Sequence, residues 1–284
     1  MELKTAGVVG AGLMGSGIAQ TMAQSGFQTI ISEINQQLLD KGLGMIKNNL
    51  SNAVAKGKIQ QADMDAVLGR IKGTTNVKDF KDCDLIVEAA VENMDLKKKI
   101  FAELDQICPP HTIIGTNSSS LSIIDLAVAT KRPEKILGLH FFNPVPVMKL
   151  LEIVKTIVTS EETLQTCKEF GAKMGKTVIT AKDAPAYIVN RLLIPYLMAA
   201  IRLYEVGYAS KEDIDAGMRL GCNYPMGPLE LLDFVGCDTA MYAAQAMFDE
   251  LHEPQMAPPL LLKKMVAAGQ LGRKTGKGFY DYRK

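Results

Sequence analysis

The feature that most constrains the fold is a glycine-rich turn at residues 10–15. A short β-branched run over Thr5–Val9 precedes this turn, helical spacing follows over residues 14–25, and a second apolar run lies at Gln28–Ser32. Strand, helix and strand in this order are typical of a parallel βαβ unit. Because parallel strands are joined by helices that cover the sheet, this stretch predicts a layered α/β domain.

The alternation of strands and helices continues along the chain. Apolar strand patterns occur at residues 84–90, 112–116 and 136–140, and residues 148–154 also have an extended pattern. Helical patterns occur at residues 35–58, as one or two helices, and at residues 95–107, where Asp95 is the expected N-cap. The predicted fold class is therefore α/β, with a Rossmann-type, doubly wound sheet in a domain spanning residues 1–184.

Strand patterns become rare after Asp183, and helical patterns replace them. The expected helices cover residues 187–206, 229–248 and 259–268, with a kink at Pro195. Ser210 with Asp213 resembles a capping box that opens another helix. These patterns predict a mostly α-helical C-terminal domain at residues 185–284. Because its apolar faces exceed what one small domain can bury, we expect a homodimer through this domain.

The composition excludes several classes of function. A formal net charge of +1 provides no basic excess for binding nucleic acid or an anionic membrane. The most apolar stretch, residues 187–201, is too short and too polar for a membrane span. The five cysteines form no C-x-x-C pair, so we expect buried, reduced thiols and neither a disulfide framework nor a zinc site. With no leader pattern before the first strand, these features favour a cytoplasmic protein without a metal.

The glycine-rich turn matches the dinucleotide-binding pattern G-x-G-x-x-G in its expected context. Its residues are Gly10, Ala11, Gly12, Leu13, Met14 and Gly15. The first glycine permits the tight turn, the second lets the backbone approach a pyrophosphate, and the third allows close packing of helix on strand. Glu33 is the carboxylate expected on the adenosine ribose, and no arginine follows it to bind a 2′-phosphate. The pattern favours NAD over NADP. The alternatives are a glycine-rich turn that binds no ligand and a Glu33 that is only a surface residue.

A histidine at a predicted strand end is the candidate acid–base group. His140 ends its strand where open α/β sheets bind ligands, whereas His111 is expected in an exposed turn and His252 in the helical region. The sequence NPVP at residues 143–146 is a reversal signal, and folding back there brings His140 opposite Glu152. A carboxylate in that place fixes the imidazole tautomer and stabilises its protonated form. The alternative is a buried histidine bonded to the backbone.

Polar residues also follow the strand at residues 112–116, in the order Asn117-Ser118-Ser119-Ser120. Amide and hydroxyl groups at such a strand end can bind a nicotinamide or a substrate oxygen. The alternative is that these residues form the N-cap of a helix at residues 121–129.

Several motifs occur together in the order found in a known family. They are the glycine-rich turn, Asn117-Ser118-Ser119-Ser120, HFFNPVPVM at residues 140–148, Val189-Asn190-Arg191, Tyr224-Pro225-Met226-Gly227-Pro228 and Gly276-Lys277-Gly278-Phe279-Tyr280. On these motifs the whole chain resembles the 3-hydroxyacyl-CoA dehydrogenases, most closely the bacterial 3-hydroxybutyryl-CoA dehydrogenases. The family often has aspartate at the position of Glu33, a departure that bears on cofactor preference.

The resemblance implies roles for individual residues. His140 would be the catalytic acid–base and Glu152 its partner. Ser119 and Asn190 would position the substrate oxygens, with Ser119 also at the cofactor, and Asn143 would lie near the nicotinamide and the substrate. The remaining implied contacts are Glu92, Lys97 and Lys274 with the cofactor and Lys56 with the phosphates of coenzyme A.

The reaction implied by the resemblance is the interconversion of 3-hydroxybutyryl-CoA and acetoacetyl-CoA by hydride transfer with NAD(H). Two alternatives stay open. One is a dehydrogenase for a free 3-hydroxy acid such as 3-hydroxyisobutyrate, in which a lysine general base would replace His140. The other is a non-catalytic dinucleotide-binding or structural protein, which would bind the cofactor without turnover.

Overall fold

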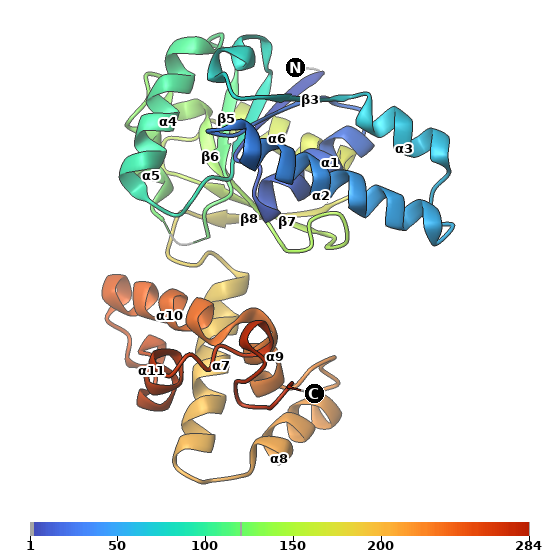
Figure 1. Ribbon diagram of the computed structural model, residues 1–284. Coiled ribbons are helices and arrows are strands. Elements are labelled where there is room, and N and C mark those ends of the chain that lie inside the picture. The colour runs from blue at the N-terminus through green and yellow to red at the C-terminus, as the bar shows by residue number, and fades with distance from the viewer. Residues whose placement is uncertain (1–2, 120, 284) are drawn as a thin grey trace. The chain divides into compact units, whose positions relative to one another are not determined.

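The computed structural model describes residues 3–119 and 121–283 of the 284-residue chain, so Ser120 of the predicted strand-end loop lies outside the described residues. The chain divides into two compact units, Met1–Ala184 and Pro185–Lys284 (Figure 1). Within the described part of the chain, no helix combines the length and the apolar character that a membrane span requires.

The first unit is built around a sheet that has eight strands in its described residues. The strands are β1 (Thr5–Val9), β2 (Gln28–Ser32), β3 (Ile71–Thr74), β4 (Leu85–Glu88), β5 (Ile113–Thr116), β6 (Ile136–Phe141), β7 (Leu150–Lys155) and β8 (Thr177–Lys182). Their order is β3-β2-β1-β4-β5-β6-β7-β8, and β7 is antiparallel to β6. The order reverses between β1 and β4, and open α/β sheets bind ligands at such a switch point. The predicted doubly wound fold is confirmed.

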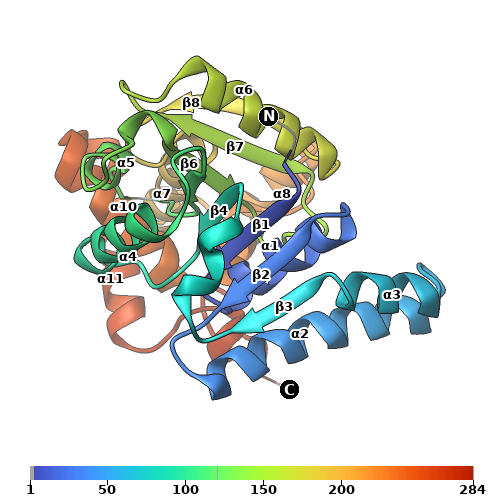
Figure 2. The same cartoon turned by 90° about the horizontal axis from the view of Figure 1, so that it is seen from above.

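Helices cover both faces of this sheet. They are α1 (Leu13–Gln24), α2 (Gln36–Ala55), α3 (Gln61–Leu68), α4 (Met94–Ile107), α5 (Ile123–Ala127) and α6 (Glu161–Lys173). Figures 1 and 2 show α4 and α5 on one side of the sheet and α1 and α6 on the other. Successive residues of β1 face opposite sides of the sheet. Val8 packs in the hydrophobic cluster that includes α1 and α6, whereas Gly7 faces Phe80, which lies 2.7 Å from where a Cβ on Gly7 would be.

One local expectation for this unit is wrong, and two of its strands were missed. The N-cap of α4 is Asn93, whose Oδ1 accepts a hydrogen bond from the Leu96 N–H at 2.9 Å, and Asp95 lies in the first turn instead. The strands β3 and β8 were also not expected from the sequence. Both are edge strands with a mixed pattern of exposed and buried residues, so they lack the apolar runs that mark the central strands.

The second unit is helical. Its helices are α7 (Val189–Glu205), α8 (Lys211–Ala216), α9 (Pro228–Val235), α10 (Cys237–Leu251) and α11 (Leu260–Ala267). Helix α7 continues through Pro195, and Ser210 caps α8 by accepting a hydrogen bond from the Asp213 N–H at 3.1 Å, as predicted. The single helix expected over residues 229–248 is wrong, because Gly236, at a φ of 106°, separates α9 from α10.

Two buried aspartates organise the second unit. Asp215 accepts hydrogen bonds from the first two N–H groups of α9, at 2.8 and 2.9 Å. Asp233 accepts hydrogen bonds from the N–H groups of Phe279 and Tyr280, both at 2.8 Å. The carboxylates therefore fix the start of a helix and hold the C-terminal segment that carries the Gly276–Tyr280 motif.

The cysteines are free thiols, as expected, but they are not all buried. Four are buried and Cys222 is exposed, which corrects the expectation of five buried thiols. Burial raises the pKa of the Cys83 thiol to about 12 and that of Cys108 to about 11. These two groups are therefore held as unreactive thiols near neutral pH.

Candidate active site

The glycine-rich turn joins β1 to α1 beside the switch point. Gly10 has a φ of 99°, and a Cβ there would lie 2.7 Å from the carbonyl oxygen of Ala89. A Cβ on Gly15 would lie 1.8 Å from the carbonyl oxygen of Gly10, so the protein's own packing requires both glycines. A Cβ on Gly12, by contrast, would meet nothing within 4 Å. The open space beside Gly12 fits the approach of a pyrophosphate to the N-terminus of α1.

Glu33 lies directly after β2, against this turn. Its Oε2 accepts a hydrogen bond from the Ala11 N–H at 2.9 Å, and its Oε1 accepts one from the Ile34 N–H at 2.8 Å. The carboxylate is half-buried, and each of its oxygens has lone pairs for a further donor. The geometry thus brings the acidic residue and the glycine-rich turn together, which is the arrangement that dinucleotide sites use to hold the adenosine ribose.

His140 and Glu152 lie opposite one another at the junction of β6 and β7. They form a register pair of the antiparallel ladder, so the predicted juxtaposition is confirmed. The Nδ1–H of His140 donates to the Oε2 of Glu152 at 2.7 Å, and the two side chains are 7% and 0% exposed. Because the carboxylate holds Nδ1, the ring is oriented with Nε2 as the nitrogen for exchanging a proton with a ligand.

The residues that follow β5 connect the neighbouring strand ends. The Oδ1 of Asn117 accepts a hydrogen bond from the N–H of Phe141 at 3.0 Å, which ties the end of β5 to the residue after His140. Ser118 is buried and donates its hydroxyl to a carboxylate oxygen of Glu92. Ser119 is half-buried in the same loop. This strand end therefore links the β4, β5 and β6 loops through side chains.

The alternative role for this loop, as the N-cap of a helix starting at residue 121, is wrong. Helix α5 begins at Ile123, with Ser122 in the N-cap position and no capping bond from its side chain. The carboxylate of Asp183 takes that function, since it accepts hydrogen bonds from the N–H groups of Ile123 and Ile124 at 3.2 and 2.7 Å. Burial raises the pKa of the Asp183 carboxyl above its usual value.

A buried ionic cluster that we did not predict supports the end of β4. Glu88 is fully buried and accepts hydrogen bonds from the Nζ of Lys97 at 2.6 Å, from the Oγ1 of Thr116 at 2.7 Å and from the N–H of Ala90 at 2.7 Å. The Nζ of Lys97 also lies 3.4 Å from the Oε2 of Glu92. Lys97 is only 1% exposed, so a direct contact with a cofactor stays a prediction. The sequence signal for this cluster was Glu88 itself, because a charged residue at the end of an apolar strand is buried only when it has a partner.

The other residues implied by the resemblance lie in different places. Asn143 is exposed in the loop between β6 and β7, and Lys56 is exposed at the C-terminal end of α2. Asn190 is the second residue of α7 and thus belongs to the second unit. Lys274, also in the second unit, forms an ion pair with Asp238 at 2.5 Å.

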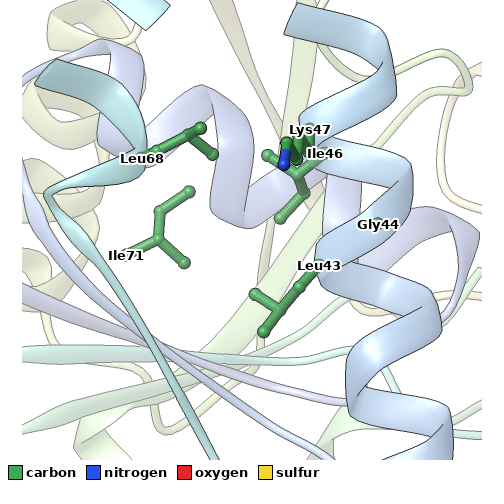
Figure 3. A pocket seen from close by; sticks show the side chains of 6 residues that line it. All are labelled: Leu43, Gly44, Ile46, Lys47, Leu68 and Ile71. Atoms are coloured by element: carbon green, nitrogen blue, oxygen red, sulfur yellow. The ribbon is translucent and has the colours of Figure 1, made fainter. Parts of the chain in front are cut away.

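An apolar pocket of about 280 Å³ in the first unit does not contain this site (Figure 3). It lies between α2, α3 and β3, and its lining residues are Leu43, Gly44, Ile46, Lys47, Leu68 and Ile71. None of the residues proposed for catalysis or cofactor binding lines it. Within residues 3–119 and 121–283, no group of three or more histidine, cysteine, aspartate or glutamate side chains is arranged to hold a metal ion.

Comparison with known proteins identifies the family. The model of the "3-hydroxyacyl-CoA dehydrogenase, NAD binding domain" matches residues 5–184, and the model of the C-terminal domain of the same enzymes matches residues 187–282. The chain belongs to the 3-hydroxyacyl-CoA dehydrogenase family. Its first unit is accordingly the NAD-binding domain of this family, and the open space at Gly12 with the carboxylate of Glu33 agrees with that assignment.

Relatives of this family match along their whole length. The chain is 45% identical over 277 residues to a 3-hydroxybutyryl-CoA dehydrogenase of Clostridioides difficile, covering 98% of this chain and 99% of that protein. It resembles the crystal structure of the (S)-3-hydroxybutyryl-CoA dehydrogenase from Ralstonia eutropha with a TM-score of 0.97, at 43% identity and full coverage of both chains. A diketoreductase described as acting on dicarbonyl compounds is similar at 33% identity, with a TM-score of 0.87 over 99% of this chain and 100% of its own.

Proposed function

We propose that this protein interconverts 3-hydroxybutyryl-CoA and acetoacetyl-CoA with NAD(H). The observation that carries the proposal is the buried pair of His140 and Glu152 in the same unit as the dinucleotide turn. The names of the full-length relatives support this choice of substrate. The pair supplies what the reaction needs, because oxidation of a 3-hydroxyacyl-CoA at C3 requires one group that takes up the hydroxyl proton. NADH, when bound, supplies the hydride that reduces C3.

The chain's own residues move the proton and hold the reacting oxygen. In reduction, protonated His140 donates from Nε2 to the oxygen on C3, and in oxidation the neutral ring takes that proton back. Glu152 keeps the ring in the required tautomer and offsets the positive charge of the imidazolium. Ser119 and Asn190 position the substrate oxygens, and Asn143 lies near the nicotinamide and the substrate.

The cofactor contacts that we propose follow the strand ends. Glu33 binds the ribose hydroxyls and disfavours a 2′-phosphate, which gives a preference for NAD over NADP. Glu92 contacts the cofactor from the loop after β4, and Lys97 orients it, since the Nζ of Lys97 lies 3.4 Å from the Oε2 of Glu92. Lys274 reaches the cofactor and Lys56 meets the phosphates of coenzyme A, each as a surface cation.

The test is the oxidation of NADH followed at 340 nm with acetoacetyl-CoA, beside free acetoacetate and beside NADPH. We expect fast turnover of the thioester with NADH and slow turnover in the other two arms. Turnover of the free acid without turnover of the thioester would favour a free-acid dehydrogenase. The similarity to a diketoreductase that acts on dicarbonyl compounds is the observation behind this second candidate. Binding of NADH by folded protein with no turnover of either substrate would favour a non-catalytic protein.

We also propose that the protein is a homodimer formed through the second unit. A groove of about 440 Å³ there is lined mainly by apolar side chains, among them Leu203, Tyr208 and Met218. Tyr208 is 79% exposed, and the hydroxyl of Tyr196, buried at the groove, has no hydrogen-bond partner among the described residues. A second copy of the chain would cover this apolar surface.

Light scattering tests this interface. We expect a dimer in dilute solution, and we expect Tyr208→Glu to produce monomers because it places a charge in an apolar contact. Tyr242→Glu, at an exposed position of α10 that does not line the groove, is the control and should remain dimeric. A wild-type monomer would contradict the proposal.

The free cysteines are consistent with a reducing compartment, and we propose that the protein acts in the cytoplasm.

A further inference from the structure

A buried lysine holds the segment that joins the two strands of the acid–base pair. Lys176 lies directly before β8 and is 8% exposed. Its Nζ donates to the carbonyl oxygen of Val145 at 2.6 Å and to that of Met148 at 2.7 Å. Both carbonyls belong to residues 143–149, between the strand of His140 and the strand of Glu152. The ammonium group thus bridges two points of one loop.

The position is unusual for a lysine, because a buried ammonium group ordinarily has an acidic partner. Within residues 3–119 and 121–283, no carboxylate forms an ion pair with its ammonium group. Burial, together with the positive charge of Lys149, lowers the pKa of Lys176 below its usual value. A buried charge held only by carbonyl dipoles is costly, so its presence needs a reason other than the overall stability of the fold.

The loop itself has few bonds of its own. The N–H groups of Val147 and Met148 both donate to the carbonyl oxygen of Pro144, which forms a local turn that does not itself bond to the sheet. The end of the segment is tied to β8, because the N–H of Thr177 donates to the carbonyl oxygen of Lys149 at 2.7 Å. On the other side, a Cβ on Gly17 of α1 would lie 3.1 Å from the Cβ of Val145. The loop therefore lies between the dinucleotide-binding helix and the ammonium group of Lys176.

We infer that Lys176 is a positioning residue for the reaction, which holds residues 143–149 so that Asn143 faces the nicotinamide and the substrate. It acts through the carbonyls of Val145 and Met148 and does not touch the reacting atoms. The pair of His140 and Glu152 is held by the strand ladder, so it does not depend on this tether. The inference rests on the proposed function, because it assigns Lys176 an effect on Asn143.

Hydrogen–deuterium exchange of the backbone tests the tether without any assay of activity. In Lys176→Met we expect exchange to become at least about tenfold faster in residues 143–149, because two carbonyls lose their donor and the loop opens locally. Residues 150–155 of β7 should keep their protection. Lys182→Met, which removes an exposed lysine from the same β8 strand, is the matched control and should leave both segments unchanged. Unchanged exchange in residues 143–149 of the Lys176 variant would overturn the inference, whatever the enzyme's substrate.

A double-mutant cycle then distinguishes positioning from a general structural role. We expect Lys176→Met to lower kcat about tenfold or more in the wild-type background, since displacing an orienting group by about 1 Å can cost more than that. In the Asn143→Ala background, Lys176→Met should lower kcat by less than about twofold, because the side chain that Lys176 positions is already absent. An equal loss of kcat in both backgrounds would overturn the inference. If the methionine variant does not fold, Lys176→Gln replaces it in the cycle: its side chain is shorter and neutral, so the bridge between the two carbonyls is weakened, and kcat should still fall more in the wild-type background than in the Asn143→Ala background.

Discussion

Two sites in the sheet of the first unit each contain a buried glutamate paired with a basic side chain, but the two pairs have different chemistry. At β6 and β7, the fully buried Glu152 binds His140, and at β4, the fully buried Glu88 binds Lys97. Imidazole gains and loses a proton near neutral pH, whereas an ammonium group serves as a point charge. In the mechanism that we propose, the buried carboxylate prepares a proton carrier in the first case, and in the second case it anchors loops. We call these two groups the His140 pair and the Glu88 cluster, the latter comprising Glu88, Lys97 and Thr116.

The largest expected effect comes from removing the proton carrier of the His140 pair. We expect His140→Gln to lower kcat for acetoacetyl-CoA by about 10²–10⁴-fold, because general acid–base catalysis contributes roughly that factor. The affinity for NADH, measured by fluorescence titration, should change little. His111→Gln, at an exposed turn residue, is the control and should keep the wild-type kcat. A His140 variant with undiminished turnover would remove that residue from the mechanism.

The Glu88 cluster should respond in stability rather than in rate. We expect Glu88→Gln to lower the free energy of unfolding by about 3–5 kcal/mol, because it leaves the buried ammonium of Lys97 without its nearest counter-charge. Urea denaturation measures this change, and the folded variant should keep most of its kcat. Glu103→Gln, an exposed residue on the same helix as Lys97, is the matched control. A stability loss below about 0.5 kcal/mol would remove the distinction between the two groups.

The smallest expected effect concerns a carboxylate outside both groups. Glu33→Gln removes the charge and leaves one oxygen, so it can keep only one of the two backbone hydrogen bonds that the carboxylate accepts. We expect the preference for NADH over NADPH to fall about tenfold, or about 1.4 kcal/mol, since repulsion of a 2′-phosphate is lost. Steady-state kinetics with both cofactors measures it, with Asp40→Asn on the exposed face of α2 as the control. An unchanged ratio of the two activities would show that Glu33 does not set the preference.

The His140 pair and the dinucleotide turn could both be predicted from the sequence. The His140 pair was predictable because one strand pattern, one reversal signal and the period of two in a ladder place residues 140 and 152 opposite each other. The glycine-rich turn and Glu33 were predictable because their spacing follows from the βαβ unit itself. The chemical roles of these residues stay predictions.

The Glu88 cluster was not predictable in the same way. The partners of Glu88 lie 9 and 28 residues away on a helix and on another strand, and no local pattern relates them. The split at Gly236 and the cap at Asn93 were missed because they depend on one backbone angle and on one side-chain rotamer. The edge strands β3 and β8 were missed because a strand that is only half covered lacks a continuous apolar run.

Single-turnover kinetics of Glu152→Gln test the central claim, that a buried carboxylate makes His140 the proton carrier. Enzyme saturated with NADH is mixed with acetoacetyl-CoA in a stopped-flow instrument, and the loss of absorbance at 340 nm reports the hydride step. Glutamine can still accept the hydrogen bond from Nδ1, so the variant isolates the charge of Glu152. We predict that this step slows by about 10²–10⁴-fold while the affinity for NADH and the fold are preserved. A hydride step at the wild-type rate would contradict the account.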